Sequence, residues 1–131
     1  MGTQERSLFV VIPAYNEAAI IAATLAPLIA ANYKIVVVDD CSSDDTWNVL
    51  QSLPVIRIRH MINLGQGAAL QTGMEYARMA GAGIVVHFDA DGQHDASQIP
   101  AMVAPIAAGR AYVAFGSRFL RDVDSREIPR S

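Results

Sequence analysis

Four short runs of almost unbroken apolar residues constrain the fold of this chain most. They are LFVVIP at 8–13, KIVVVDD at 34–40, PVIRIRH at 54–60 and GIVVHFDAD at 83–91, and a weaker run, AYVAFGS, follows at 111–117. Short runs rich in β-branched residues are typical of strands. Because the apolar residues of the runs at 8–13, 34–40 and 83–91 do not alternate with polar ones, both faces of the sheet must be covered, as in a mainly parallel sheet between helices.

The segments between these runs have the residue spacing of helices. In the first, apolar residues recur on one helix face from Ile21 to Ile29, and Asn16 is placed to cap that helix ahead of Glu17. Ser42 or Ser43 can cap a second helix, which has Asp44 and Asp45 in its first turn. A third helix is predicted from about Gly67 to Met79 and a fourth over about 97–108. Alternating strands and helices predict a three-layer α/β/α sandwich.

Composition narrows the class of protein. The chain has 131 residues, of which 52% are apolar and 18% charged, as expected for one globular domain. A formal net charge of −3 gives no basic field for nucleic acid, so DNA and RNA are excluded as partners. Cys41 is the single cysteine, the first residues lack a signal-peptide pattern, and no apolar stretch reaches membrane-spanning length. These features predict a cytoplasmic protein.

Ligands of open parallel sheets bind beyond the carboxyl ends of the strands, so the residues after each run are the candidates. After the first run, Pro13 would stiffen a turn that exposes the Tyr15 ring and the Glu17 carboxylate. The base of a nucleotide could stack on that ring. For this motif alone, the simpler interpretation is that Pro13 turns the chain and Tyr15 covers the core. Asp39 and Asp40 end the second run, where their carboxylates could accept a hydrogen bond from a ribose hydroxyl or from a base N–H. The alternative is that they only cap the next turn.

The fourth run ends in two carboxylates, Asp89 and Asp91, which point the same way if the chain is extended. Oxygen ligands suit a hard divalent cation that also binds substrate phosphates, and the Gln93 amide could add another. An acidic turn of this kind also occurs by chance, but here it terminates a buried strand. His94 could join it or lie on the surface, whereas His60 and His87 are set aside.

Two further segments bear on phosphate binding. The stretch NLGQGAALQTG lacks the spacing and position of a dinucleotide-binding loop, which disfavours a nicotinamide-dependent oxidoreductase. Gly65 and Gly67 instead allow backbone amides to approach a sugar or phosphate, or they simply begin a helix. Arg118 is placed to pair with a phosphate, and the polar segment 119–131 is predicted to be a loop or tail.

Five motifs in order, VVIPAYNE, VVVDDCSSDDT, NLGQGAALQTGMEYA, FDADGQH and GSRF, make the chain resemble the family 2 glycosyltransferases. Within that family it is most similar to polyprenol-phosphate sugar synthases of the dolichyl-phosphate mannose synthase type. The resemblance implies a GT-A fold, which is Rossmann-like. It also implies inverting transfer of a sugar from a UDP- or GDP-sugar with Mg²⁺ or Mn²⁺, to a polyprenyl phosphate or a glycan.

The resemblance also implies roles for individual residues. Asp89 and Asp91 would be catalytic and, with Gln93, would bind the metal. Arg118 and Arg130 would meet the diphosphate. The nucleotide-sugar pocket would further include Pro13, Tyr15, Glu17, Val38, Asp39, Asp40 and Ala90.

The chain departs from the family pattern in three places. Cys41 stands where a glycine or another small or polar residue is usual, and Met61 and Ile62 stand where a charged or polar residue is common. The family's catalytic domain continues for about another hundred residues, so residues 1–131 are expected to be the N-terminal nucleotide-sugar-binding part of an incomplete domain. The alternative is a non-catalytic or truncated nucleotide-sugar-binding module.

Two expectations about partners follow from the resemblance and from the short chain. A polyprenyl-phosphate acceptor would bring the protein to the inner face of the membrane as a peripheral contact. An incomplete sheet would expose apolar surface, which favours a homodimer.

Overall fold

The computed structural model describes residues 8–88, 113–115 and 118–119. Six strands in these residues form one sheet in the order β3-β2-β1-β4-β5-β6. The strands are β1 (Leu8–Ala14), β2 (Lys34–Asp39), β3 (Ile56–Arg59), β4 (Ile84–His87), β5 (Val113–Phe115) and β6 (Arg118–Phe119). The helices are α1 (Ile21–Ala30), α2 (Thr46–Gln51) and α3 (Gln66–Met79). Strands β1 to β5 pair in parallel, and β6 pairs antiparallel to β5.

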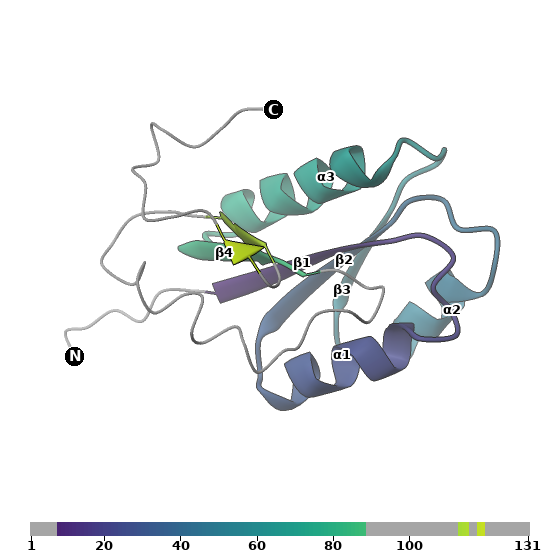
Figure 1. The fold of residues 1–131 in the computed structure, drawn as a ribbon, viewed down its shortest axis with the longest axis horizontal. Coiled ribbons are helices and arrows are strands. Elements are labelled where there is room, and N and C mark those ends of the chain that lie inside the picture. Colours follow the sequence, from purple (N-terminus) through teal and green to yellow (C-terminus); the bar gives the residue numbers. More distant parts are fainter. Residues whose placement is uncertain (1–7, 89–112, 116–117, 120–131) are drawn as a thin grey trace.

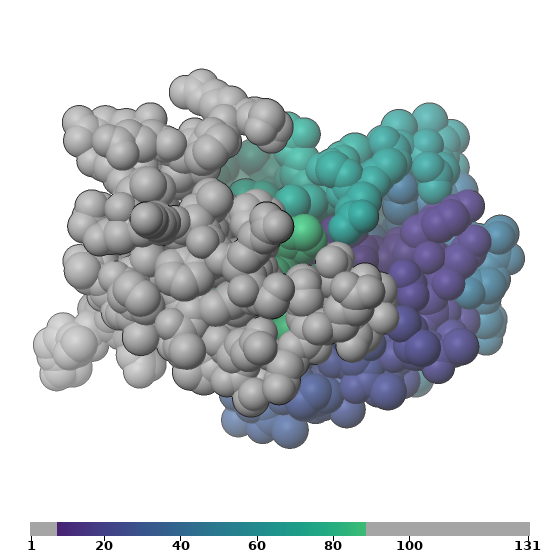
Figure 2. Space-filling view, in the orientation of Figure 1, coloured from purple at the N-terminus to yellow at the C-terminus, as the bar shows by residue number. Residues whose placement is uncertain are grey.

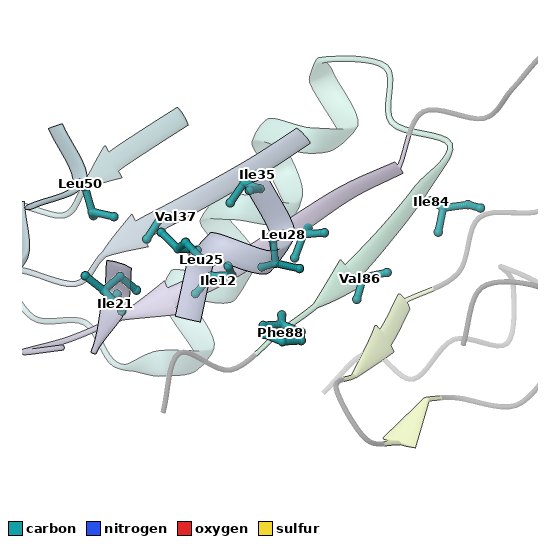
Figure 3. Packing of buried hydrophobic residues seen from close by; sticks show 12 residues of the cluster. Ile12, Ile21, Leu25, Leu28, Ile35, Val37, Leu50, Ile84, Val86 and Phe88 are labelled. Atoms are coloured by element: carbon teal, nitrogen blue, oxygen red, sulfur yellow. The ribbon is translucent and has the colours of Figure 1, made fainter. Parts of the chain in front are cut away.

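The sheet is buried on both faces, as the apolar runs predicted. In Figure 1, α3 lies on one side of the sheet and α1 and α2 on the other. Ile12 and Val37 point toward α1 and pack with Leu25 and Leu28 of that helix, as Figure 3 shows. Val11 and Val38 point the other way, into a second cluster that includes Ala69 and Ala77 of α3. The three-layer α/β/α sandwich is therefore confirmed.

Helix α3 approaches the sheet closely at Gly73. A Cβ atom at this position would lie 2.4 Å from Cγ1 of Val11 and 3.1 Å from Cγ2 of Val38. The first distance is shorter than carbon atoms tolerate, so only glycine fits without a shift of the helix or the valines. Gly73 thus sets the spacing between α3 and strands β1 and β2.

Both predicted helix caps are wrong. Helix α1 begins at Ile21, and the amides of Ile20 and Ile21 donate to the Glu17 carbonyl, so Asn16 lies well before the helix. Helix α2 begins at Thr46 instead of next to Ser42 or Ser43. The physical reason is the same for both helices: the predicted capping side chains, those of Asn16, Ser42 and Ser43, bind a neighbouring loop instead of their own helix, as described below.

Several expectations lie outside the described residues. These are the predicted helix at 97–108 and most of the predicted tail at 119–131, of which Phe119 belongs to β6. The pairing of β6 with β5 was not predicted. None of the described helices has both the length and the apolar character that crossing a membrane requires.

Candidate functional site

The loops that follow β1, β2 and β3 gather at one edge of the sheet, which lies to the right in Figure 1. Strand β1 lies between β2 and β4, so the loops after β1 and β2 adjoin one another. Figure 2 shows the early part of the chain, in purple, at the surface beside the teal atoms of the α3 region. This edge is where the carboxyl ends of parallel strands place a ligand.

Pro13 lies within β1 rather than in the turn that the sequence predicted, with Val38 as its partner in register. The β1–β4 pairing extends only to Val11 and His87, and the next amide, that of Phe88, donates to the Val11 carbonyl. Proline has no N–H with which to continue a ladder, so pairing with β4 stops at this point. The two strands can therefore diverge beyond Pro13.

Side chains of the loop after β2 and of the first residue of α2 hold the loop after β1. The Asn16 amide donates to Ser42 Oγ at 2.8 Å, and the Glu17 amide donates to Thr46 Oγ1 at 2.9 Å. In return, Asn16 Oδ1 accepts the Ser43 amide at 2.8 Å. Asn16 has φ 54, a left-handed conformation that asparagine tolerates better than most residues. These bonds explain why Asn16 and the two serines do not cap helices.

Tyr15 remains available to a ligand, because 46% of its surface is exposed at this edge. Glu17 is half-buried beside it. Val38, in contrast, packs its whole side chain into the cluster beneath α3. Val38 was predicted to line the pocket, and with its side chain buried it could do so only through its backbone.

Asp39 is completely buried, and its two carboxylate oxygens differ in their contacts. Oδ1 accepts hydrogen bonds from the amide and the hydroxyl of Ser42. Oδ2 has no hydrogen-bond donor among the described residues and lies 3.8 Å from Nε of Arg59. Arg59 and Arg57 both lie over the Trp47 ring, at 5.1 and 4.0 Å. Asp39 therefore fixes the turn after β2 with one oxygen and faces a cation with the other.

Asp40 is also buried, and it holds the loop that precedes α3. Its Oδ1 accepts the Leu64 amide at 2.9 Å and its Oδ2 accepts the Gly65 amide at 2.8 Å. Nδ1 of His60 lies 2.8 Å from Oδ1. Burial raises the pKa of the Asp40 carboxyl, but the hydrogen bonds from Leu64, His60 and Gly65 outweigh it and hold the pKa below its ordinary value. Asp40 is therefore an ionised anchor.

This anchor changes the interpretation of the glycine-rich stretch. The Gly65 amide, predicted to approach a sugar or phosphate, instead binds the Asp40 carboxylate. Asn63 adds a bond from its side-chain amide to the Asp40 carbonyl at 3.2 Å. A protein carboxylate thus occupies the place at the start of α3 that one of the two interpretations of the sequence gave to a ligand anion.

Gly65 adopts φ 103 and ψ 159, and Cys41, where the family resemblance favours glycine, adopts φ 65. Both values lie in the region that glycine prefers. We expect Gly65→Ala to lower the free energy of unfolding by about 1 kcal/mol, since the side chain meets no atom but strains the backbone. Chemical denaturation would measure the change.

The control for Gly65→Ala is Gly67→Ala, because Gly67 is helical and a Cβ there also meets nothing within 4 Å. It should leave the stability unchanged or slightly raise it, since alanine favours helix. Equal stability of the two variants would contradict a strained backbone at Gly65.

His60 is the functional candidate that the sequence interpretation missed. It directly follows β3, so the rule of inspecting the residue after each strand would have found it. Its partners are Asp40 and Thr72, whose Oγ1 lies 2.8 Å from Nε2. These partners are 20 and 12 residues away in sequence, which no local pattern reveals.

The structure brings Tyr15, Glu17, Asp39 and Asp40 to one edge of the sheet. Arg118 is placed by its backbone alone, opposite Phe115. Among the described residues, no three histidine, cysteine, aspartate or glutamate side chains are grouped to hold a metal ion. The predicted metal ligands and the remaining pocket residues lie outside the described residues: Asp89, Ala90, Asp91, Gln93 and Arg130.

Comparison with known proteins adds an independent line of evidence. A family model described as glycosyl transferase family 2 matches residues 9–131. An uncharacterized protein of Methanocaldococcus jannaschii is 40% identical over 123 residues, which cover 93% of this chain and 51% of that protein. The UDP-N-acetylglucosamine–dolichyl-phosphate N-acetylglucosaminyltransferase of Methanococcus voltae is 33% identical over 143 residues, covering 95% of this chain and 57% of that enzyme.

Other similar proteins extend the comparison. The dolichol-phosphate mannosyltransferase of Pyrococcus furiosus is 36% identical over 120 residues, covering 86% of this chain and 33% of that enzyme. Among solved structures, glucosyl-3-phosphoglycerate synthase from Mycobacterium tuberculosis, in complex with Mn²⁺, UDP and glucosyl-3-phosphoglycerate, superimposes with a TM-score of 0.61 at 26% identity. The match covers 79% of this chain and 40% of that one. The chain thus spans between 33% and 57% of the length of these proteins.

Proposed function

Because the chain belongs to glycosyl transferase family 2, we propose that it is the nucleotide-sugar-binding part of an enzyme that transfers a sugar from a nucleoside diphosphate to a polyprenyl phosphate. The strand order supports this most. The chain runs outward from β1 to β2 and β3 and then returns to β4 on the other side of β1. Ligands of open α/β sheets bind at such a reversal, here between the segments that follow β1 and β4.

In this proposal the two segments have different roles. The loop after β1 and the end of β2 hold the nucleoside, with the exposed Tyr15 ring available for stacking on a base. The segment that follows β4 continues from the buried Phe88 and supplies Asp89 and Asp91. The residues proposed for the nucleotide sugar are Pro13, Tyr15, Glu17, Val38, Asp39, Asp40, Ala90, Arg118 and Arg130.

Asp89, Asp91 and Gln93 are the proposed ligands of a divalent cation, Mg²⁺ or Mn²⁺. The donor set fits such an ion, because hard cations prefer carboxylate and amide oxygens. The support from the described residues is the position of β4, which pairs with β1 and ends next to it, close to Pro13. The cation would neutralise charge on the departing nucleoside diphosphate. The Mn²⁺ and UDP in the mycobacterial neighbour are consistent with this choice.

The proposed transfer inverts the anomeric carbon. A phosphate oxygen of the acceptor forms a bond to that carbon while the bond to the donor diphosphate breaks, and the nucleoside diphosphate leaves. A phosphate monoester is largely ionised at neutral pH, so this acceptor needs no general base. The names of the methanococcal and Pyrococcus relatives support a polyprenyl-phosphate acceptor.

A lipid-linked acceptor implies work at the cytoplasmic face of a membrane. The loop after β3 exposes three large apolar side chains within four residues: Met61, Ile62 and Leu64. Exposed apolar groups of this kind are consistent with a peripheral membrane contact.

The second candidate function is nucleotide-sugar binding without transfer. The chain spans 51% of the Methanocaldococcus protein and 57% of the Methanococcus enzyme, so its donor binding and its transfer are tested separately. Both functions require binding of the donor, and only the first requires transfer. Incubating the protein with a UDP- or GDP-sugar and a polyprenyl phosphate, and assaying for the glycolipid, separates the two.

The binding site is tested by calorimetric titration of UDP- and GDP-sugars, with and without Mn²⁺. We expect Asp91→Asn to weaken the Mn²⁺-dependent affinity by about tenfold or more, because the cation loses an anionic ligand. Asp45→Asn is the matched control, since it makes the same charge change at an exposed position whose side chain binds only Asn48 among the contacts described. Binding that needs no metal and survives Asp91→Asn would refute the proposed site.

A further inference from the structure

His60 links the end of β2 to α3 through both of its ring nitrogens. Nδ1 lies 2.8 Å from Asp40 Oδ1, and Nε2 lies 2.8 Å from Thr72 Oγ1. The His60 backbone amide also donates to the Asp39 carbonyl at 2.9 Å. Only 9% of the His60 side chain is exposed, so the ring is held on several sides.

The proton positions follow from the chemistry of the partners. An ionised carboxylate only accepts hydrogen bonds, so Nδ1 of His60 must carry the proton that it shares with Asp40. The Thr72 hydroxyl can donate as well as accept, and it therefore satisfies Nε2 with or without a proton there. Thr72 of α3 thus fixes the orientation of the His60 ring, and the ring in turn orients the Asp40 carboxylate.

The contacts of Asp40 leave one acceptor position unused. A carboxylate offers about four lone-pair positions. Oδ1 accepts from the Leu64 amide and from His60, whereas Oδ2 accepts from the Gly65 amide alone among the described contacts. The unused position is therefore on Oδ2.

We propose that His60 is a positioning residue that holds Asp40 so that Oδ2 accepts an N–H from the base of the nucleotide. This proposal rests on the proposed function and narrows its donor class. Uracil and guanine each carry a ring N–H next to a carbonyl, whereas the corresponding ring nitrogen of cytosine is an acceptor. A carboxylate that meets this ring nitrogen therefore favours uridine or guanosine diphosphates over cytidine diphosphate, which offers only its exocyclic amino group.

The test compares UDP, GDP, CDP and inorganic pyrophosphate, each with Mg²⁺, by calorimetry. Pyrophosphate reports on the diphosphate subsite without a base. We expect His60→Ala to weaken the preferred nucleotide, UDP or GDP, by about tenfold, the equivalent of one charge-assisted hydrogen bond, and to leave pyrophosphate affinity unchanged. His60→Asn, whose amide can donate in place of Nδ1, should restore most of the affinity.

A separate readout tests the positioning itself. The Leu64 and Gly65 amides share Asp40 with His60, so their ¹H–¹⁵N signals should move in His60→Ala and return in His60→Asn. If His60→Ala does not fold, Thr72→Val replaces it, since that change removes only the hydroxyl at Nε2. It should also weaken the preferred nucleotide and leave pyrophosphate unchanged.

Three results would overturn the proposal. They are unchanged nucleotide affinity in His60→Ala, an equal loss for nucleotide and pyrophosphate, and wild-type CDP affinity that equals that of UDP and GDP. If the wild type binds no nucleotide, the proposed function fails and the base contact fails with it. In that case the Leu64 and Gly65 signals still show whether His60 positions Asp40.

Discussion

Replacing Asp40 with alanine is expected to lower the free energy of unfolding by about 3 kcal/mol or more, because buried donors would lose a charged acceptor. The donors are the Leu64 and Gly65 amides and Nδ1 of His60. None of them gains a new partner from the alanine methyl group. Urea denaturation followed by circular dichroism would measure the loss.

The matched control is Glu75→Ala. Glu75 is an exposed carboxylate on α3 whose partner is the exposed Arg78, and an exposed ion pair contributes little to stability. Its removal should leave the denaturation midpoint nearly unchanged. Equal losses for Asp40→Ala and Glu75→Ala would contradict the anchoring role of Asp40.

The Asp40 anchor also predicts a pH dependence. The pKa of Asp40 is lowered in the folded chain, so its stabilising effect is complete above the unfolded pKa and is lost as pH falls through the folded pKa. The stability difference between wild type and Asp40→Asn should therefore narrow as pH falls below about pH 4. A difference that widens in acid would contradict the lowered pKa.

Gly73→Ala is expected to destabilise the protein by about 2 kcal/mol even though alanine is the better helix former, because overpacking outweighs helix propensity. The new methyl group would lie 2.4 Å from Cγ1 of the buried Val11. Either α3 moves away from β1 and β2 or the valines leave their preferred rotamers. Thermal and chemical denaturation would both register the loss.

Gly67→Ala again provides the control, since it makes the same substitution in the same helix where no atom lies within 4 Å. The double variant with Gly73→Ala and Val11→Ala should lose less stability than the sum of the losses in the two single variants. The reason is that Val11→Ala removes the methyl groups with which the new Cβ clashes. Strict additivity of the two changes would show that the contact is not the cause.

The fold was predictable from sequence because its strands carry their own signal. The runs at 8–13 and 34–40 differ from β1 and β2 by one residue each, and the GT-A arrangement implied by the resemblance is confirmed. Strand β6 has two residues, too few for any periodicity, and was missed. The caps were wrong because Asn16 binds residues 27 and 28 positions away instead of its own helix.

The position of Asp39 and Asp40 at the end of β2 was predictable from sequence, whereas their contacts were not. The paired aspartates do lie at the sheet edge, as a strand-end rule requires. Their partners could not be predicted, because Asp40 binds His60, Leu64 and Gly65 across 20 to 25 residues. A carboxylate that the sequence offered to a ligand is therefore also an internal anchor, and only the folded chain shows this second role.

Strand β3, at the end of the strand order, has a consequence for the protein's behaviour in concentrated solution. Its sequence alternates isoleucine with arginine, and Arg57 and Arg59 lie along it over Trp47. If the β3 strands of two copies paired with each other, the arginines of one copy would lie next to those of the other. Repulsion between these like charges opposes such pairing. The edge is therefore protected against sheet-to-sheet aggregation, so any self-association should use another surface.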